Sequence, residues 1–264
     1  MTTSKRLLAV VLAAVAVSTG ADGQTAVTNS YMIGAGATAI LDTYLSQEKF
    51  SGTGLTIMGT SERRKQGQQW TTLWEHELNF ATTDDRSTTV SELQGDYTLL
   101  AGRLRTWQLP KLTLKAGLMG ALNLGFIYNT SNSNNPAQGR LSLNIMPAIG
   151  GSYDFPLFGK TWTANYELQL PLLGLMFSPN YGQSYYEIFS RGNYDHNVVP
   201  TTFIAAPNFR QLITVGCRLS RRFTLRIGYL GNYQQANVNN LKSHIYSHRL
   251  MIGFVRSFTI THRP

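Results

Sequence analysis

The chain has 264 residues, of which 42% are hydrophobic and 14% are charged, and its net charge is +9. An average soluble domain has about 25% charged residues, so this composition is unusual for one. A mean hydropathy of −0.15 excludes a bundle of membrane-spanning helices. The single cysteine, Cys217, excludes an intramolecular disulfide, and its place on an apolar parity predicts a small buried hydrophobic side chain.

The N-terminus has the layout of a secretory signal peptide. Lys5 and Arg6 precede an apolar stretch, residues 7–20, and small residues follow it. This order predicts a signal peptide over residues 1–23 and a single mature domain over 24–264. An uncleaved membrane anchor is the alternative, although the apolar stretch is short for a spanning helix. The mature chain stays basic, which for an exported protein favours an anionic envelope surface, and not nucleic acid, as its partner.

A two-residue alternation recurs along the chain, and "TWTANYELQL" (161–170) shows it most clearly. Such alternation is typical of a strand with one apolar face and one polar face. The apolar parity comprises Trp162, Ala164, Tyr166, Leu168 and Leu170. The polar parity comprises Thr161, Thr163, Asn165, Glu167 and Gln169.

Repeats of this pattern predict ten strands, and no segment between them has convincing helical periodicity. One strand, 88–106, requires a bulge if all of its charged side chains are to share one face. The predicted strands are 31–45, 53–63, 69–82, 88–106, 111–129, 139–154, 160–171, 208–220, 222–236 and 242–258.

The connections alternate between short turns and longer loops, one of which spans residues 172–207. Short turns at one rim, longer loops at the other and an even strand number are typical of an outer-membrane β-barrel. Most of the strands exceed the ~9–11 residues that cross a bilayer at a tilt. We therefore expect an all-β, antiparallel, up-and-down transmembrane barrel of about ten strands, or twelve if 172–207 contributes a hairpin. A soluble secreted barrel or sandwich is the alternative.

Aromatic residues gather near both predicted rims, as interfacial rings do in transmembrane barrels. The periplasmic group is Trp70, Trp107, Phe155, Trp162, Phe223 and Phe258, and the outer group is Phe80, Tyr128, Tyr233 and Tyr246.

The segment "YMIGAGATAILDTYLSQEKFSGTGL" (31–55) resembles the opening of a family of Bacteroidetes envelope proteins catalogued as a domain of unknown function, number 3316. The resemblance implies an outer-membrane setting but brings no activity or substrate. In this segment Asp42 and Tyr44 share the lumen parity, and Gly52 and Gly54 permit a sharp reversal. We interpret the motif as a structural latch, with a ligand site as the alternative. The residues that carry the resemblance are Leu41, Asp42, Thr43, Tyr44, Leu45, Ser46, Phe50, Ser51, Gly52 and Gly54.

Charged side chains of both signs fall on the predicted inward parities. Because a barrel of this size is only a little wider than one filled by its own side chains, we expect these charges to pair and plug the lumen. The alternative is a selective water path or ligand pocket. The predicted lumen network comprises Glu75, Glu77, Glu92, Asp96, Arg103, Arg105, Lys115, Arg140, Glu167, Arg218, Arg226 and Arg249.

No phosphate loop, zinc motif or nucleophile elbow is present, so we expect no cofactor and no metal. Two histidines, His76 and His248, fall on lipid-facing parities. The weak candidates for a hydrolase at the outer rim are Asp84, Asp85, Asp195 and His196.

The long segment 172–207 is rich in aromatic residues, and a cluster of solvated rings is costly unless covered. The segment could fold over the mouth, extend the sheet above the membrane or bind a partner, and the aromatics favour the first two. The aromatics that a merely solvated loop would expose include Tyr181, Tyr185, Tyr186, Phe189 and Tyr194.

The function that these patterns favour is a small, non-enzymatic envelope protein in a Gram-negative outer membrane, with a structural or partner-binding role. Its expected partners are outer-membrane lipid, lipopolysaccharide and possible neighbouring envelope proteins. A narrow solute pore and a rim hydrolase are the alternatives.

Overall fold

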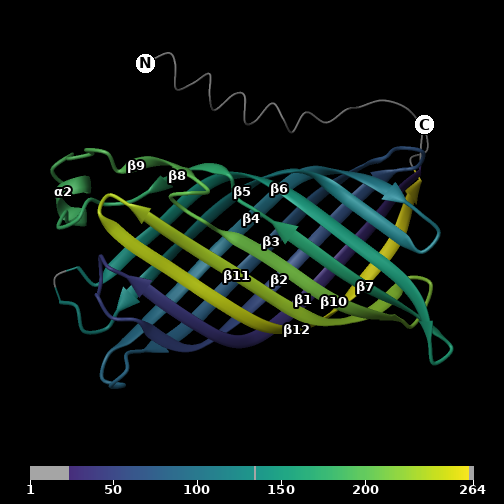
Figure 1. The fold of residues 1–264 in the computed structure, drawn as a ribbon, viewed down its shortest axis with the longest axis horizontal. Coiled ribbons are helices and arrows are strands. Elements are labelled where there is room, and N and C mark those ends of the chain that lie inside the picture. The colour runs from purple at the N-terminus through teal and green to yellow at the C-terminus, as the bar shows by residue number, and fades with distance from the viewer. Residues whose placement is uncertain (1–23, 134, 262–264) are drawn as a thin grey trace, which may run out of the picture.

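The alternating segments form a closed antiparallel β-barrel in the computed structural model, which describes residues 24–133 and 135–261 (Figure 1). The predicted signal peptide lies outside the described residues. The ten strands of the barrel are β1 (Gln24–Asp42), β2 (Phe50–Lys65), β3 (Trp70–Asp84), β4 (Ser91–Gln108), β5 (Leu112–Asn129), β6 (Ala137–Leu157), β7 (Lys160–Gln169), β10 (Phe209–Arg218), β11 (Phe223–Val238) and β12 (Leu241–Thr261).

Hydrogen-bonded pairing follows the chain around the ring. The strand order is β5-β4-β3-β2-β1-β12-β11-β10-β7-β6, and pairing of β5 with β6 closes it. The first strand pairs with the last from Gln24↔Thr261 to Asp42↔Ser243. Short turns join the strands at one end, and the longer connections lie at the other (Figure 1). The predicted up-and-down topology with about ten strands is confirmed.

Residues 172–207 add structure of their own, which we name the outer hairpin. It contains β8 (Leu173–Phe177), helix α2 (Tyr185–Phe189) and β9 (Val198–Thr202). The strand β8 pairs with the part of β6 that β7 leaves free, and β9 pairs with β8. The sheet thus has twelve strands. The two short strands extend the barrel wall beside β6 but are not members of the closed ring of ten (Figure 1).

The predicted bulge in 88–106 is wrong. Pairing of β4 runs without a register change from Trp70↔Arg105 to Asp84↔Ser91 on one side, and from Glu92↔Asn129 to Gln108↔Thr113 on the other. Unbroken alternation puts Arg103 and Arg105 on the same face as Trp107, where all three are exposed. These two arginines therefore do not belong to the lumen network.

The outer face is largely apolar, and the large exposed side chains include Ile33, Leu78, Leu118 and Ile252. Every aromatic residue that was predicted for the two rims lies on this outward parity. Cys217 also lies there and is only partly covered, so the prediction of a buried cysteine is wrong. None of the helices in the described part of the chain is long and apolar enough to cross a membrane.

The interior is filled by side chains of mixed polarity. One apolar cluster contains Met32, Met58, Leu212, Leu230 and Met251. Another contains Leu73, Leu100, Leu104, Met119, Ala121, Met146 and Ala148. Buried charged and amide groups lie among these clusters, and they are described next.

Candidate functional site: polar clusters in the barrel interior

Arg210 is the centre of the largest polar cluster. Alternation from Phe209 onward points it inward from β10, where it is buried. Its Nη2 lies 2.6 Å from Glu75 Oε1 and 2.7 Å from Glu77 Oε2. Its Nε donates to Glu77 Oε2 at 2.9 Å, and its Nη1 donates to Gln169 Oε1 at 3.2 Å. One guanidinium thus connects two glutamates on β3 with a glutamine on β7.

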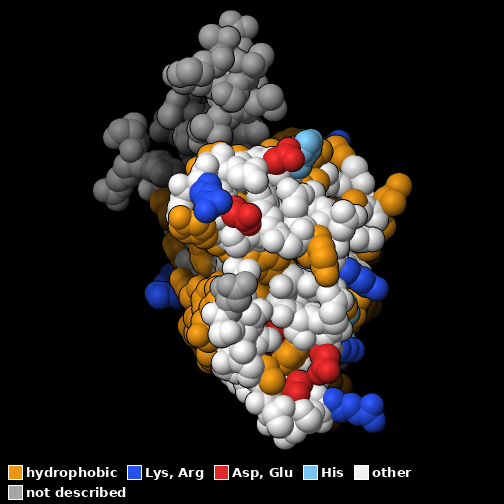
Figure 2. Space-filling view, turned by 90° about the vertical axis from the view of Figure 1, so that its left-hand side faces the viewer, with side chains coloured by type: hydrophobic (Ala, Val, Ile, Leu, Met, Phe, Trp, Pro, Cys, Tyr) orange, Lys and Arg blue, Asp and Glu red, His pale blue; other side chains and the backbone are white. Residues whose placement is uncertain are grey.

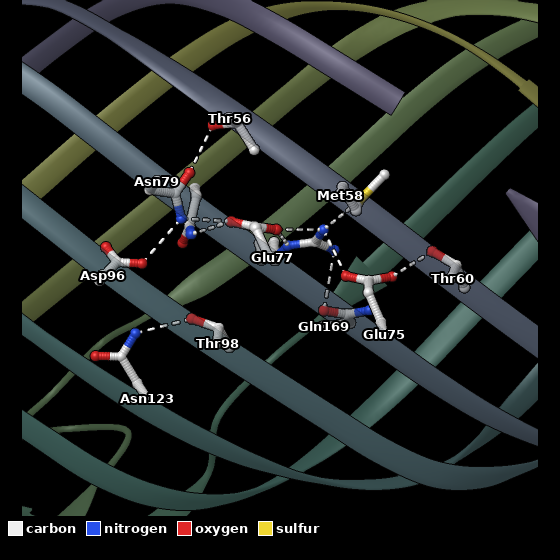
Figure 3. Close-up of polar contacts among 12 residues, drawn as sticks. Thr56, Met58, Thr60, Glu75, Glu77, Asn79, Asp96, Thr98, Asn123 and Gln169 are labelled. Atoms are coloured by element: carbon white, nitrogen blue, oxygen red, sulfur yellow. Dashed lines mark hydrogen bonds and ion pairs between the residues drawn. The ribbon is translucent and has the colours of Figure 1, made fainter. Parts of the chain in front are cut away.

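Amide side chains extend this cluster along the inner wall (Figure 3). Asn79 Nδ2 donates to Glu77 Oε1 and to Asp96 Oδ2, both at 2.9 Å. Asn79 Oδ1 accepts a hydrogen bond from Thr56 Oγ1 at 2.5 Å. Asn232 on β11 donates to Glu77 Oε1 at 3.3 Å. Because each contact fixes its neighbour, the buried carboxylates are held in one arrangement.

The cluster crosses the whole interior. In the ring order, β3 and β10 stand five places apart among ten strands, so Glu77 and Arg210 meet from opposite walls. A second cross-lumen contact has the same geometry: Arg140 Nη1 on β6 lies 4.0 Å from Asp42 Oδ2 on β1, also five places away. Arg140 Nη2 also donates to Gln234 Oε1 at 3.1 Å. The interior is bridged at two levels.

Two further predicted network members have partners that are fewer than five strands away in the ring. Lys115 Nζ pairs with Glu62 Oε2 at 2.5 Å near the short-turn end. Glu92 Oε1 accepts from Asn129 Nδ2 at 3.1 Å near the long-loop end.

Arg249 is buried and has no carboxylate partner among the described residues. Its Nη1 donates to the Ala37 carbonyl at 2.6 Å, and its Nη2 donates to Thr38 Oγ1 at 2.7 Å. Gly54 makes room for it, because a Cβ at that position would collide with Arg249 Nη2. Gly54, a glycine of the 31–55 motif, therefore leaves the space that the buried Arg249 side chain occupies.

The remaining predicted members, Glu167, Arg218 and Arg226, also have inward parity. Arg218 is exposed at the short-turn rim, and the Nε of Arg226 is buried without a hydrogen-bond partner in the described structure.

The predicted lumen network omitted several groups that the clusters use, among them Arg210, Asn79 and Glu62. A usable signal was present for Arg210, which shares its parity with Arg218 on the same strand.

The outer hairpin is tied to the barrel mouth by tyrosine hydroxyls. Tyr185 Oη accepts from the Gly139 amide at 2.6 Å and donates to Gln138 Oε1 at 2.8 Å. Tyr44 Oη donates to the Gln183 carbonyl at 3.1 Å, and the Tyr44 and Tyr185 rings meet edge to face with centroids 5.8 Å apart. Burial is the main cause that raises the pKa of Tyr44 and of Tyr185 to about 12, so both hydroxyls stay protonated. Tyr44 of the family motif thus contacts the outer hairpin directly.

Most aromatics of the outer hairpin remain uncovered, unlike Tyr185. The segment does extend the sheet, but the expectation that folding would cover its rings is wrong for four of the five. The exposed fractions are 66% for Tyr181, 62% for Tyr186, 63% for Phe189 and 64% for Tyr194.

The candidate hydrolase residues fall into separate groups. Asp84 accepts from Ser91 Oγ at 2.6 Å. Asp85 organises the β3–β4 turn: it accepts from Ser87 Oγ at 2.5 Å and from the Thr89 amide at 2.8 Å. The Ser87 hydroxyl is the main cause that lowers the pKa of Asp85 to about 2.

Asp195 and His196 contact each other through Oδ1 and Nδ1 on the outer hairpin, with side chains 70% and 83% exposed. No contact joins this pair to Asp84 or Asp85 within the described chain, and no third catalytic group meets it there. The described residues also contain no group of three or more His, Cys, Asp or Glu that could hold a metal ion.

Comparison with known proteins gives a family and a set of distant likenesses. The model of the family described as "Protein of unknown function (DUF3316)" matches residues 5–263. None of the curated proteins compared with the chain matches it.

Three solved structures illustrate the likenesses. The outer membrane protease OmpT from Escherichia coli has 9% identity and a TM-score of 0.46, covering 93% of this chain and 100% of its own. The translocator domain of the autotransporter NalP from Neisseria meningitidis has 11% identity and a TM-score of 0.38, with 97% and 94% covered. Ail of Yersinia pestis has 8% identity and a TM-score of 0.35, with 90% and 100% covered. With identities and TM-scores this low, none of the three transfers an activity or a partner to this chain.

Proposed function

The chain belongs to the DUF3316 family, and we propose that it is a non-enzymatic outer-membrane barrel with a lumen closed by its own side chains and a structural or partner-binding role in the envelope. The observation that carries this proposal is the contact of Arg210 with Glu75 and Glu77 across the full width of the barrel.

Placement in an outer membrane is supported by the outer face. Lipid cannot hydrogen-bond to backbone groups, so a strand-built membrane domain must be a closed barrel with an apolar exterior. This chain has both properties, and aromatic rings lie on the outward parity near each rim. The uneven turn lengths support an orientation with the short-turn end in the periplasm. Export through cleavage after Gly23 is part of the same proposal.

Closure of the lumen is supported by how tightly the interior is filled. A cavity of about 90 Å³ lies between Arg140, Asn232 and the outer hairpin, and it has room for about three water molecules. Figure 2 looks onto the long-loop end and shows no wide opening among the side chains that it draws. A solute crossing the lumen would have to break the contacts of Arg210 and Arg140 that span it.

A partner-binding role is supported by the exposed rings of the outer hairpin. Aromatic side chains are enriched at protein interfaces and are costly to leave in water. The four exposed rings lie on a segment fixed by Tyr44 and Tyr185, which offers a preorganised surface to another envelope protein. Outer-membrane lipid and lipopolysaccharide surround the barrel in this proposal.

Conductance in planar bilayers tests the closed lumen. The parent should be nearly silent, and Arg210→Ala should leak because it removes the side chain that spans the interior. Arg218→Ala is the matched control, since it removes an inward arginine from the same strand at the open rim. Steady, ion-selective conductance by the parent would instead establish a narrow solute pore.

Assays of the purified protein against peptide and lipid substrates test the non-enzymatic role. We expect no turnover above the detergent blank. Turnover that is lost in Asp195→Ala or His196→Ala would establish a hydrolase at the outer rim.

A further inference from the structure

Four arginines form a row on the outward face near the short-turn end, which we name the basic rim: Arg63 on β2, Arg103 and Arg105 on β4, and Arg256 on β12. All four are exposed. They occupy neighbouring parts of the ring, because only β3 separates β2 from β4 and only β1 separates β2 from β12. Thr72 on β3 is the direct cross-strand neighbour of both Arg63 and Arg103.

Tryptophan rings lie among these arginines. The Arg103 Cζ is 6.0 Å from the centre of the Trp70 ring, and the Arg105 Cζ is 5.4 Å from that of Trp107. Trp70 and Arg105 are direct cross-strand neighbours. Tryptophan prefers the headgroup level of a membrane, so its position fixes the depth of these guanidinium groups. Arginine stems can lie along apolar surface while the charged heads reach that level.

Among the described residues, no carboxylate forms an ion pair with the basic rim. At this end of the described barrel the acidic residues are Glu62 and Asp154, and both have inward parity. Glu62 is paired with Lys115. Further exposed cations lie in the short turns, namely Lys111, Lys160, Arg221 and Arg222. The long-loop end differs, because Figure 2 shows acidic and basic side chains together there.

We propose that the basic rim binds the phosphate groups of anionic phospholipids in the periplasmic leaflet of the outer membrane. This inference rests on the proposed function, which sets the leaflet, and it identifies residues that hold the barrel at a defined depth. A guanidinium offers paired N–H donors that match phosphate oxygens. The open row presents these donors at headgroup depth without a competing internal anion.

The test compares lipid retention by native mass spectrometry after the protein is released from vesicles of phosphatidylcholine mixed equally with phosphatidylglycerol. The first variant replaces Arg63, Arg103, Arg105 and Arg256 with glutamine, and a second replaces them with lysine. The matched control replaces Lys49, Arg86, Arg191 and Lys242 with glutamine, which removes the same charge from exposed positions at the long-loop end. Mobility before and after boiling checks that each variant folds.

The parent should retain phosphatidylglycerol over phosphatidylcholine by about tenfold or more, because each cation near an anionic surface contributes measurably to binding. The glutamine variant of the basic rim should lose that preference, and the control should keep it. The lysine variant should keep part of it, since charge remains but the planar fork does not. If the glutamine variant of the rim misfolds, the lysine variant decides the question. A lysine variant that prefers phosphatidylglycerol as strongly as the parent does would contradict recognition by the guanidinium groups.

Equal retention of phosphatidylglycerol by the parent and the folded glutamine variant of the rim would overturn the proposal. An equal loss of phosphatidylglycerol in the rim variant and in the control would overturn it as well. Those results leave the outer-membrane role intact as long as the protein inserts into the mixed vesicles. A parent that does not insert into them would overturn the outer-membrane role and the lipid site together.

Discussion

Arg210 is the residue on which the interior contacts depend most, because it is buried and meets two carboxylates from the opposite wall. Replacing it with methionine leaves Glu75 and Glu77 without their counter-charge. Removing one member of a buried ion cluster costs about 3–5 kcal/mol. We expect Arg210→Met to lower the free energy of unfolding by that amount, measured by urea titration in lipid vesicles with the unboiled gel band as the folded signal.

The control for this prediction is Arg222→Gln, which removes an exposed arginine from the turn between β10 and β11. A change on such a surface should stay within about 0.5 kcal/mol. Equal unfolding midpoints for the Arg210 and Arg222 variants would show that the cross-lumen cluster contributes nothing to stability.

Gly54 allows a second residue-level test. A Cβ at Gly54 would meet the Phe80 carbonyl oxygen at 2.7 Å and Thr38 Oγ1 at 2.8 Å, besides colliding with the Arg249 guanidinium. Overpacking of this kind costs about 1–3 kcal/mol, so Gly54→Ala should unfold at lower urea. Gly59→Ala on the same strand is the control, because its Cβ would contact only the Tyr31 ring, at 3.7 Å. Indistinguishable midpoints for the two alanine variants would contradict the packing argument.

The alternation in the sequence predicted most of the inward-facing charged residues correctly. It was overridden for the arginines near the membrane interface. Arg103 and Arg105 share the parity of Trp107, but charge alone suggested an inward position and a bulge. Near a membrane interface a long cation can reach water from the lipid-facing side, so charge does not identify the inner face there. The pairing of Arg210 with Glu77 was not predictable, because it depends on which strands stand opposite after the ring closes.

At the scale of elements, the hydroxyl of Tyr185 ties the outer hairpin to β6. Tyr185→Phe keeps the ring contacts but leaves the Gly139 amide without its acceptor. This donor is partly buried, so its loss should cost toward the low end of the ~1–3 kcal/mol of an unsatisfied buried donor. Hydrogen–deuterium exchange at Gly139 and α2 should rise accordingly. Tyr186→Phe is the neighbouring control, because its exposed ring has no hydroxyl bond in the described structure. The same exchange rise in both variants would rule out a specific tie.

The β3–β4 turn should loosen in acid. Because the folded pKa of Asp85 is lowered to about 2 from 3.8, its ionised form stabilises the turn fully above pH 3.8. That stabilisation is lost as the pH falls through about 2. A carboxyl carbon signal for Asp85 that titrates near pH 2 in NMR, together with shifts at Thr89 and Val90, would support this. Titration at the ordinary value of an aspartate would contradict it.

The ten barrel strands were predictable because each repeats a two-residue period between polar turns. The structure of the outer hairpin was less predictable from the sequence. Its strands β8 and β9 have five residues each, too few for a clear period, and α2 is a single short helix that starts with a capping box at Ser184. Its long connection could be recognised as folded or functional from length alone, but its pairing with β6 follows from the early end of β7.

On the scale of the whole molecule, ring closure is the property that separates this barrel from an open sheet. Every full-length strand has a partner on both sides, and the β1–β12 pairing completes the ring. A closed ring has no edge strand with unpaired backbone groups at which unfolding by detergent could begin. We therefore expect the folded protein to resist SDS without heat and to migrate as a compact band, faster than after boiling.

Leu250→Pro tests whether closure of the ring causes the resistance to SDS. Leu250 lies on the outward face of β12, paired with Ala35 on one side and Tyr229 on the other. Proline there removes a ladder hydrogen bond from a strand that is paired on both sides, where proline is not accommodated, so the fast band should weaken or vanish. Leu250→Val keeps the ladder and should migrate like the parent. If the parent shows one mobility before and after boiling, or is recovered as a freely soluble periplasmic protein, then the closed barrel does not reside in the outer membrane as proposed.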